Sequence, residues 1–292
     1  MKKSNSLNIT HMQSKEVEGG LRTKGEGRNS YNHNPLVSIV TVVFNGERFL
    51  EGTIKSVLNQ TYENVEYIII DGGSADGTLD IIRQYKDEID YWRSKKDQGI
   101  YDAMNQGIAL CTGEIIGIIS ADDFYDQNTI SLVVKTFQKS HADIIFGNKL
   151  MINEEIGLQR VVSVAVPDSA NNTAINNVHP TVFVARQIYE KFLFDTSYKI
   201  AADYDLMIRF FGANYKFEKI DSVLVVMRSG GASSLFNLEN VKIRYKYFGI
   251  VAAMKKLITV ILKMFLNNIL RTFGLTKQYY LKKGWESTSK II

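Results

Sequence analysis

Carboxylates follow two of the most apolar segments of the chain. Asp122 and Asp123 come shortly after residues 115–119, and Asp71 comes directly after residues 67–70. Continuous β-branched runs of this kind are typical of buried parallel strands, whose carboxyl ends bind ligands in open α/β sheets. Carboxylates gathered at one edge of a sheet repel one another unless a cation or a ligand compensates them. The pattern therefore indicates a site for a metal or a polyphosphate.

Each acid also has a simpler explanation. Asp often caps the helix that follows a strand, and Asp71 or one member of the pair Asp122 and Asp123 can act in this way. A single cap explains only one of two adjacent acids. The pair therefore favours a binding site more strongly than Asp71 does.

Strands and helices alternate along the chain. We expect strands at residues 36–43, 65–70, 90–93, 115–119 and 142–147, and helices at residues 47–59, about 76–85, 99–110 and around 130–134. The pattern weakens afterwards, and residues 161–177 are expected to form loop and short strand. Strand, helix and strand at this spacing form right-handed parallel units. The chain is thus predicted to be an α/β protein with a mostly parallel, Rossmann-like sheet flanked by helices.

The composition is that of a folded protein. Of the 292 residues, 45% are hydrophobic and 23% are charged, which suits one large α/β domain with an appendage. The single cysteine, Cys111, excludes an intrachain disulfide and a zinc site built from cysteines. This cysteine usage fits a protein of a reducing compartment. No apolar segment follows the basic N-terminus, so we expect no signal peptide and a cytoplasmic protein. Residues 1–34 are expected to be a disordered leader.

The C-terminal tail is basic and amphipathic. Ten of the 35 Lys and Arg residues lie between Val241 and Gly284, and no acid does. Polar residues recur every four positions from Lys255 to Arg271 among apolar ones, which predicts an amphipathic helix. Its apolar runs are too short for a bilayer, which needs about 18 residues or more.

Two interpretations of the tail stay open. Residues 241–284 fit an anionic membrane surface, and they also fit a helix that packs on its own domain or in a homodimer. We expect no nucleic-acid partner, because the basic residues are confined to the tail and no recognition motif accompanies them.

Five motifs occur in a fixed order from the first strand onward. They cover residues 40–45 (VTVVFN), 56–62 (SVLNQTY), 70–78 (IDGGSADGT), 97–107 (DQGIYDAMNQG) and 120–123 (SADD). In this order and spacing, the motifs resemble those of family-two glycosyltransferases with the GT-A fold, over roughly residues 35–231. The resemblance implies transfer of a sugar from a nucleotide diphosphate, expected to be UDP, to a hydroxyl group with inversion at the anomeric carbon.

The resemblance also implies a donor site in the first half of the chain. Its nucleotide-sugar contacts would come from Thr41, Phe44, Asn45, Asp71, Asp102 and Asp122. Asp123 matches the last acid of the family's Asp-x-Asp element, which binds Mg²⁺ or Mn²⁺ together with the diphosphate; both are hard cations that prefer oxygen ligands. Phe44 fits an ordinary core equally well, and Asp97 and Asp102 fit capping roles.

The second half of the chain is expected to supply the base. Asp203 matches the family's general base, which takes the proton of the acceptor hydroxyl. A plain helix cap is the alternative. Asp205 is expected to be structural or to face the acceptor, and Arg209 to pair with a local carboxylate.

Two further residues are candidates for the site. His179 precedes the Asp203 helix and fits either a contact to metal or phosphate or a hydrogen-bonded structural residue. Arg228 begins a Gly-rich segment that resembles the family's flexible loop, which closes over the diphosphate; a linker to the tail is the alternative.

Three positions depart from the family pattern. Gly72 stands where many relatives carry a second acid, Met104 where many carry Arg, and Ala121 at the first acid of the Asp-x-Asp element. The first two departures remove a ribose contact and a cation facing the diphosphate. The expected metal ligand and base remain.

These observations define the expected organisation and function. We expect a disordered leader at 1–34, a GT-A glycosyltransferase domain at 35–231 and a basic amphipathic helical tail at 232–292. The acceptor would be a glycan or a lipid-linked glycan in cell-envelope polysaccharide synthesis, with peripheral attachment at the inner face of the plasma membrane if the tail binds lipid. A nucleotidyltransferase and an inactive sugar-nucleotide-binding protein are the alternatives.

Overall fold

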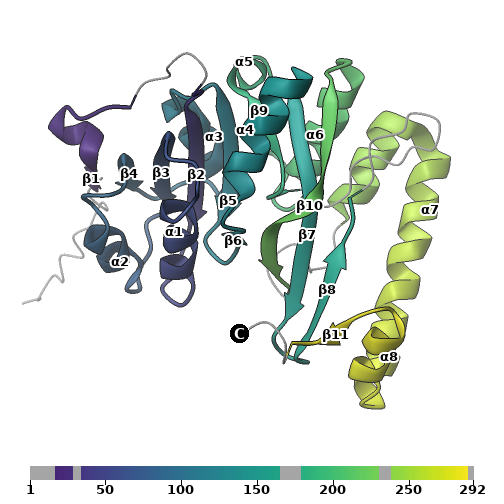
Figure 1. Cartoon of the computed structure of the whole chain (residues 1–292). Helices are drawn as coiled ribbons and strands as arrows, with labels where there is room; N and C mark the ends of the chain where they lie inside the picture. The colour runs from purple at the N-terminus through teal and green to yellow at the C-terminus, as the bar shows by residue number, and fades with distance from the viewer. Residues whose placement is uncertain (1–16, 29–33, 165–178, 230–237, 289–292) are drawn as a thin grey trace, which may run out of the picture.

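The computed structural model describes residues 17–28, 34–164, 179–229 and 238–288. These residues form one mixed sheet covered by helices on both faces (Figure 1). Its main path runs in the order β1 (Val17–Gly19), β4 (Tyr91–Ser94), β3 (Val65–Asp71), β2 (Val37–Val43), β5 (Ile115–Ser120), β9 (Phe183–Ala185), β7 (Ile144–Asn153), β10 (Phe217–Arg228) and β6 (Phe124–Tyr125). The predicted α/β class with a Rossmann-like sheet is confirmed.

The first half of the sheet is parallel, as the alternation of elements predicts. Strands β4, β3, β2 and β5 pair in parallel, and every residue of β2 and β3 is buried. Burial on both faces explains why these strands are almost continuously apolar. Because all four strands point the same way, the turns after β2, β3, β4 and β5 meet at one edge.

The second half of the sheet is mixed. Strand β9 pairs antiparallel with both β5 and β7, and β7 pairs in parallel with β10. Strand β8 (Leu158–Val162) pairs antiparallel with β7, and β11 (Glu286–Ser287) pairs with β8. The short β9 therefore joins the two halves into one sheet.

Helices cover the two faces in separate layers. Apolar side chains of α1 (Leu50–Leu58), α2 (Thr78–Gln84) and α4 (Thr129–Ser140) pack in one core, and those of α3 (Ile100–Leu110), α5 (Arg186–Tyr189) and α6 (Ala202–Gly212) pack in another. Successive strand residues face opposite layers, as Val40 and Ile39 show. The sheet thus holds α3 and α6 on the same face.

Part of the expected leader is ordered, which corrects the prediction for residues 17–28. Strand β1 pairs antiparallel with the edge strand β4, and the short 3-10 helix η1 (Leu21–Lys24) follows. Arg22 Nη1 donates to Leu110 O at 2.8 Å. The sequence did not predict β1, because a three-residue strand has no detectable periodicity. This segment is extended because it pairs with the edge strand β4. Residues 1–16 and 29–33 lie outside the described residues.

The expected tail helix is present. Helix α7 (Glu239–Thr272) is followed by α8 (Thr276–Lys282), and Gly249 interrupts α7 with φ 77° and ψ −177°. A positive φ of this kind favours glycine and kinks the helix. Within the part of the chain that the structure describes, no helix has both the length and the apolar content needed to cross a membrane.

Close packing of α3 on β2 yields a test of the fold. A Cβ added at Gly107 would come within 2.3 Å of Val40 Cγ1. We expect Gly107→Ala to lower the free energy of unfolding by about 1–3 kcal/mol, because α3 must move off the sheet. A Cβ added at Gly52 in α1 would meet nothing within 4 Å, so Gly52→Ala should raise it by about 0.5–1 kcal/mol. Urea denaturation measures both values, and equal effects would contradict the prediction.

Candidate active site

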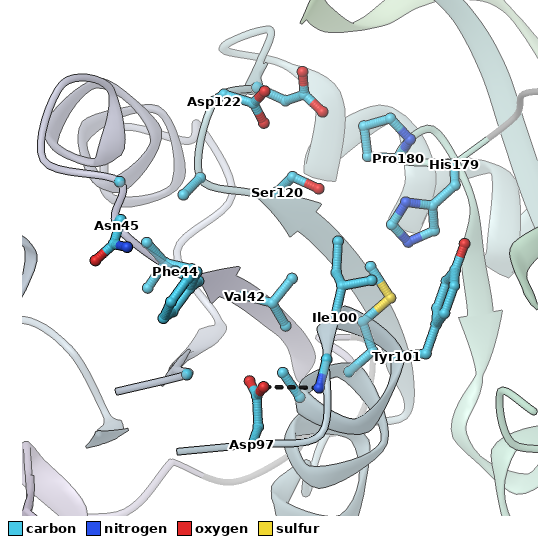
Figure 2. Close-up of a pocket in the computed structure, with 18 of the residues that line it drawn as sticks. Val42, Phe44, Asn45, Asp97, Ile100, Tyr101, Ser120, Asp122, His179 and Pro180 are labelled. Atoms are coloured by element: carbon cyan, nitrogen blue, oxygen red, sulfur yellow. Dashed lines mark hydrogen bonds between the residues drawn. The ribbon is translucent and has the colours of Figure 1, made fainter. Parts of the chain in front are cut away.

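A cavity of about 660 Å³ opens where the parallel strands end (Figure 2). Phe44 and Asn45 lie on one side of it, and Tyr101 and His179 lie on the other. Its other charged or hydroxyl-bearing lining residues are Lys96, Asp97, Ser120, Asp122, Asp123, Lys199, Asp203 and Arg228. Asp97, Asp122 and Asp123 therefore share one cavity with Asp203, although about 80 residues or more separate them from it.

The turn after β5 is held by hydrogen bonds from neighbouring elements. Thr53 Oγ1 on α1 lies 2.8 Å from Ala121 O and 2.7 Å from Asp123 O. From the end of β10, the Arg228 backbone N–H donates to Asp123 Oδ1 at 3.3 Å, and Arg228 Nη1 donates to Asp122 O at 2.7 Å. These bonds fix the backbone of the turn, and the Arg228 N–H also binds the Asp123 carboxylate at the wall of the cavity.

Asp123 is the most strongly perturbed carboxylate at this edge. Only 3% of its surface is exposed. Burial, reinforced by the neighbouring Asp122, raises the pKa of Asp123 to about 8. The buried Lys149 on β7 opposes this shift, and burial lowers the pKa of Lys149 to about 8. The site thus carries a carboxyl group that ionises readily only when more positive charge arrives.

This environment fits a hard divalent cation. A cation at the cavity wall would compensate the buried Asp123, and carboxylate oxygens are the ligands such ions prefer. Within the described residues, no group of three or more His, Cys, Asp or Glu side chains is arranged to hold a metal. A cation bound at Asp123 would therefore need oxygen ligands from water or from a phosphate.

Asp203 lies in the first turn of α6, where Ala201 is the N-cap residue. The Tyr101 hydroxyl donates to Asp203 Oδ1 at 3.2 Å. The protein packed around this carboxyl group raises its pKa, while the backbone N–H of Tyr204 and the Tyr101 hydroxyl lower it. Asp203 is thus a partly buried carboxyl group that lines the cavity, and Ala201, not Asp203, is the N-cap residue of α6.

Asn45 shapes the other side of the cavity. It adopts a left-handed conformation with φ 51°, which Asn tolerates better than most residues. Its Oδ1 accepts the Ala75 backbone N–H at 2.9 Å, and its own N–H donates to Ser74 Oγ at 2.7 Å. These bonds join the turns after β2 and β3. The preceding Phe44 is left 67% exposed at the mouth of the cavity, not in the core.

Three predicted donor residues do not line the cavity. Thr41 is fully buried, with its hydroxyl 2.9 Å from that of Tyr67. Asp71 is 1% exposed, and Ser94 Oγ donates to its Oδ2 at 2.6 Å. Asp102 Oδ2 accepts the Gln98 backbone N–H at 3.0 Å, as a cap at the start of α3. The motifs locate these residues near the strand ends, but protein donors occupy their polar atoms.

Asp97 takes the place that a side chain at position 72 would fill. A Cβ added at Gly72 would lie 2.6 Å from Asp97 Oδ2. Asp97 lines the cavity, and its Oδ1 accepts the Gly99 backbone N–H at 2.8 Å. Burial raises its pKa. The acid missing after Asp71 is therefore matched in space by an acid from the turn after β4.

His179 lines the cavity near Tyr101, with its Nε2 buried (Figure 2). Within the described residues, no group hydrogen-bonds this nitrogen. Burial and the nearby Lys149 lower the pKa of His179 to about 4, so its ring is neutral at physiological pH. The interpretation of His179 as a hydrogen-bonded structural residue therefore lacks a partner for Nε2.

Comparison with known proteins identifies the family. Residues 38–201 match the family model described as glycosyl transferase family 2. The chain belongs to glycosyl transferase family 2. The match contains the β2, β3 and β5 strand ends, and it stops two residues before Asp203.

Curated members of glycosyl transferase family 2 are similar to the chain. It is 33% identical over 189 residues to an uncharacterized glycosyltransferase of Rickettsia typhi, covering 61% of this chain and 59% of the relative. It is 32% identical over 182 residues to an uncharacterized glycosyltransferase of Mycobacterium tuberculosis, covering 60% and 68%. The chain thus spans about three fifths of the length of the Rickettsia relative.

Solved structures show that the fold is GT-A. S. aureus TarS residues 1–349, in complex with UDP-GlcNAc, match with a TM-score of 0.57 at 17% identity, over 71% of this chain and 64% of that TarS segment. The mannosyltransferase PcManGT from Pyrobaculum calidifontis, in complex with GDP-Man and Mn²⁺, matches with a TM-score of 0.55 at 18% identity, over 82% and 69%. The predicted family and fold are confirmed.

Burial of Asp123 makes stability depend on pH. The folded pKa of about 8 exceeds the ordinary 3.8, so the folded state keeps a proton that the unfolded state loses. The metal-free wild type therefore loses stability as pH rises from about 4 to 8. We expect Asp123→Asn to be more stable than wild type near pH 8, by about 1–3 kcal/mol, because the neutral amide avoids a buried charge.

Denaturation at several pH values in the presence of a chelator measures this difference. The gap between variant and wild type should grow with pH and level off above about 8. Asp80→Asn, at an exposed carboxylate on α2, is the control and should show no gap. A gap for Asp123→Asn that is constant with pH would contradict the prediction.

Proposed function

We propose that the protein transfers a sugar from a nucleotide-diphosphate sugar, with UDP the expected nucleotide, to a hydroxyl acceptor. The observation that carries this proposal is that Asp203 and the Asp122 and Asp123 edge line one cavity. Transfer would form a bond from the acceptor oxygen to the anomeric carbon and break the bond to the diphosphate oxygen. Attack from the face opposite the leaving group inverts the anomeric carbon. The acceptor proton would pass to Asp203.

The donor would bind on the side of the cavity that carries Phe44 and Asn45. An exposed aromatic ring at the cavity mouth is suited to stacking on a nucleobase. We assign the ribose contacts to Asp97 and Asp122, since Asp97 lines the cavity where position 72 offers no side chain. The complexes of TarS with UDP-GlcNAc and of PcManGT with GDP-Man support a nucleotide-sugar donor.

Asp123 is the residue that would hold a divalent cation, Mg²⁺ or Mn²⁺. Such a cation, bound together with the diphosphate, supplies Lewis-acid stabilisation of the negative charge on the leaving group. The Mn²⁺ in the PcManGT complex supports this assignment. We assign to Arg228 the role of holding the turn, because its guanidinium binds Asp122 O and Glu154.

Asp203 has the environment of a general base. Its pKa is raised, and a general base works best when its pKa lies near the working pH. The Tyr101 hydroxyl would orient it through the 3.2 Å hydrogen bond. We propose that the neutral His179 uses its unsatisfied Nε2 to bind a sugar or acceptor hydroxyl in the same cavity.

The wider setting is also a proposal. We propose a glycan or lipid-linked acceptor in cell-envelope polysaccharide synthesis on the cytoplasmic side of the plasma membrane. Residues 35–231 would carry the donor site and the base, and residues 232–292 would form the tail. The chain's mixture of a transferase fold and a basic tail supports this arrangement.

Two carboxylate variants separate the two halves of the proposed site. We expect Asp203→Asn to lower kcat by about 10²–10⁴-fold with little change in KM for the donor, because only proton transfer is lost. Asp97→Asn should instead raise KM for the donor by roughly tenfold, since one hydrogen bond to the ribose weakens. Steady-state kinetics across a panel of UDP- and GDP-sugars with Mn²⁺ measures both. Near wild-type turnover by Asp203→Asn would refute the mechanism, and Asp221→Asn, an exposed acid on β10, is the control.

A further inference from the structure

Helix α7 leaves a row of large apolar side chains in solvent. The row recurs at spacings of three and four residues, which places it on one side of the helix. We call it the α7 face; its members are 37–67% exposed and comprise Ile250, Met254, Ile258, Ile261, Phe265 and Ile269. Further exposed apolar residues flank it, among them Leu262 at 63% and Phe273 at 70%. An apolar surface of this extent marks an interaction site.

We infer that the α7 face docks on an anionic lipid surface. The segment from Val241 to Gly284 carries ten Lys or Arg residues and no acid. Basic residues beside an exposed apolar row match a bilayer interface, in which the apolar row enters the acyl boundary and the cations meet anionic headgroups. A second copy fits the same face poorly, because it would bring the seven Lys and Arg residues between Gly249 and Gly284 against the same seven of the first copy.

The two ends of the tail are tied to the body. At its start, Ile243 is fully buried against Ala201 and Tyr204. At its end, β11 pairs with β8, and the Thr288 backbone N–H donates to Gly157 O at 3.1 Å. Figure 1 shows α7 along the outside of the molecule, beyond β7, β8 and β10, with α8 returning toward β8. The tail thus packs on the body before the Gly249 kink, whereas the α7 face after the kink is exposed.

Flotation of the full-length protein with lipid vesicles tests the docking surface, whatever reaction the protein catalyses. We expect the protein to float with vesicles of mixed phosphatidylcholine and phosphatidylglycerol, and salt should weaken this binding. We expect little flotation with vesicles of phosphatidylcholine alone. Ile258→Ser with Phe265→Ser should reduce the bound fraction by roughly tenfold. Lys255→Gln with Lys263→Gln should reduce binding to the anionic vesicles. Lys135→Gln with Lys139→Gln, at exposed lysines of α4, is the matched control.

Three outcomes would overturn this inference. The first is that the wild type does not float with anionic vesicles. The second is that the apolar double variant floats as well as the wild type. The third is that the wild type binds no vesicles and is a dimer in light scattering, whereas the apolar double variant is a monomer. The last outcome would assign the face to a second copy. Thermal unfolding of each variant confirms that it is folded.

A separate set of contacts links the start of α7 to the helix that carries Asp203. Glu239 Oε1 accepts the Lys199 backbone N–H at 2.8 Å. Its Oε2 accepts the backbone N–H groups of Ile200 at 2.8 Å and Ala201 at 3.1 Å. One carboxylate thereby holds the three residues that lead into α6, immediately before the first turn that contains Asp203.

A buried carboxylate ties the two helices together further along. Asp205 is 1% exposed and bonds Arg209 Nε on its own helix at 2.7 Å. From α7, Lys246 Nζ lies 3.1 Å and Tyr247 OH 2.9 Å from Asp205 Oδ1. The predicted structural role of Asp205 and the predicted pairing of Arg209 are therefore seen, and α7 supplies two of the partners.

We propose that Glu239 is a positioning residue for Asp203, which rests on the proposed function. Loss of its three hydrogen bonds would leave the entry to α6 free to shift, and a shift of about 1 Å in a catalytic group costs up to about 100-fold in rate. Glu239 itself does not line the cavity, and none of the residues that it bonds is assigned to the donor site, so KM for the donor should change little.

Kinetics of Glu239→Ala and Glu239→Gln test this role. We expect Glu239→Ala to lower kcat by roughly 10–100-fold with KM for the donor unchanged, and Glu239→Gln, which keeps an acceptor oxygen, to recover part of the loss. Glu218→Ala on β10 is the control. Unchanged kcat in a folded Glu239→Ala, or equal losses in both variants, would overturn the proposal. If Asp203→Asn also keeps its activity, the proposed function fails; if only Asp203→Asn is inactive, the positioning role alone fails.

Discussion

The site depends on keeping a carboxyl group buried at the end of a parallel strand. Asp123 is nearly inaccessible, and isolating its charge from water is unfavourable. The surrounding elements partly offset this cost: α1 and β10 donate hydrogen bonds to the turn, and a buried lysine on β7 supplies positive charge. The remaining deficit of positive charge makes the cavity suited to a cation with phosphates. Polar groups fixed before a ligand arrives need no reorganisation during reaction.

The same constraint explains why the two halves of the sheet must join. The turns after β2, β4 and β5 line one part of the cavity, and α6 supplies Asp203. Strand β9 inserts antiparallel between β5 and β7 and sets the distance between these two parts. Tyr101 connects them chemically, since it lies on α3 and bonds Asp203 about 100 residues later. The cavity is therefore a product of long-range pairing.

Local patterns predicted strands β2 to β5, the first part of β7, helices α1 to α4 and the acidic edge, because these follow from short-range periodicity. The motifs also located Asp123, Asp203, Phe44 and Asn45, all of which line the cavity. Sequence could not reveal that Ser94 and Tyr67 bond the polar atoms of Asp71 and Thr41, since these partners come from other strands. The proximity of Asp97 to Gly72 could have been predicted from one feature: β3 and β4 are neighbouring strands, so the turns after them lie side by side. The Glu239 contacts join residues about 40 apart that share no motif.

Because the chain returns from α8 to β8, the tail contacts the body of the protein at both of its ends. Residues 250–272 form an uninterrupted helical stretch of roughly 34 Å at the usual rise per residue. A helix of fixed length that is held at both ends sets the distance between the cavity and any surface on which the helix lies. An acceptor anchored in that surface would be modified only where its hydroxyl reaches this height. The reach of the acceptor, in addition to its chemistry, would then select the substrate.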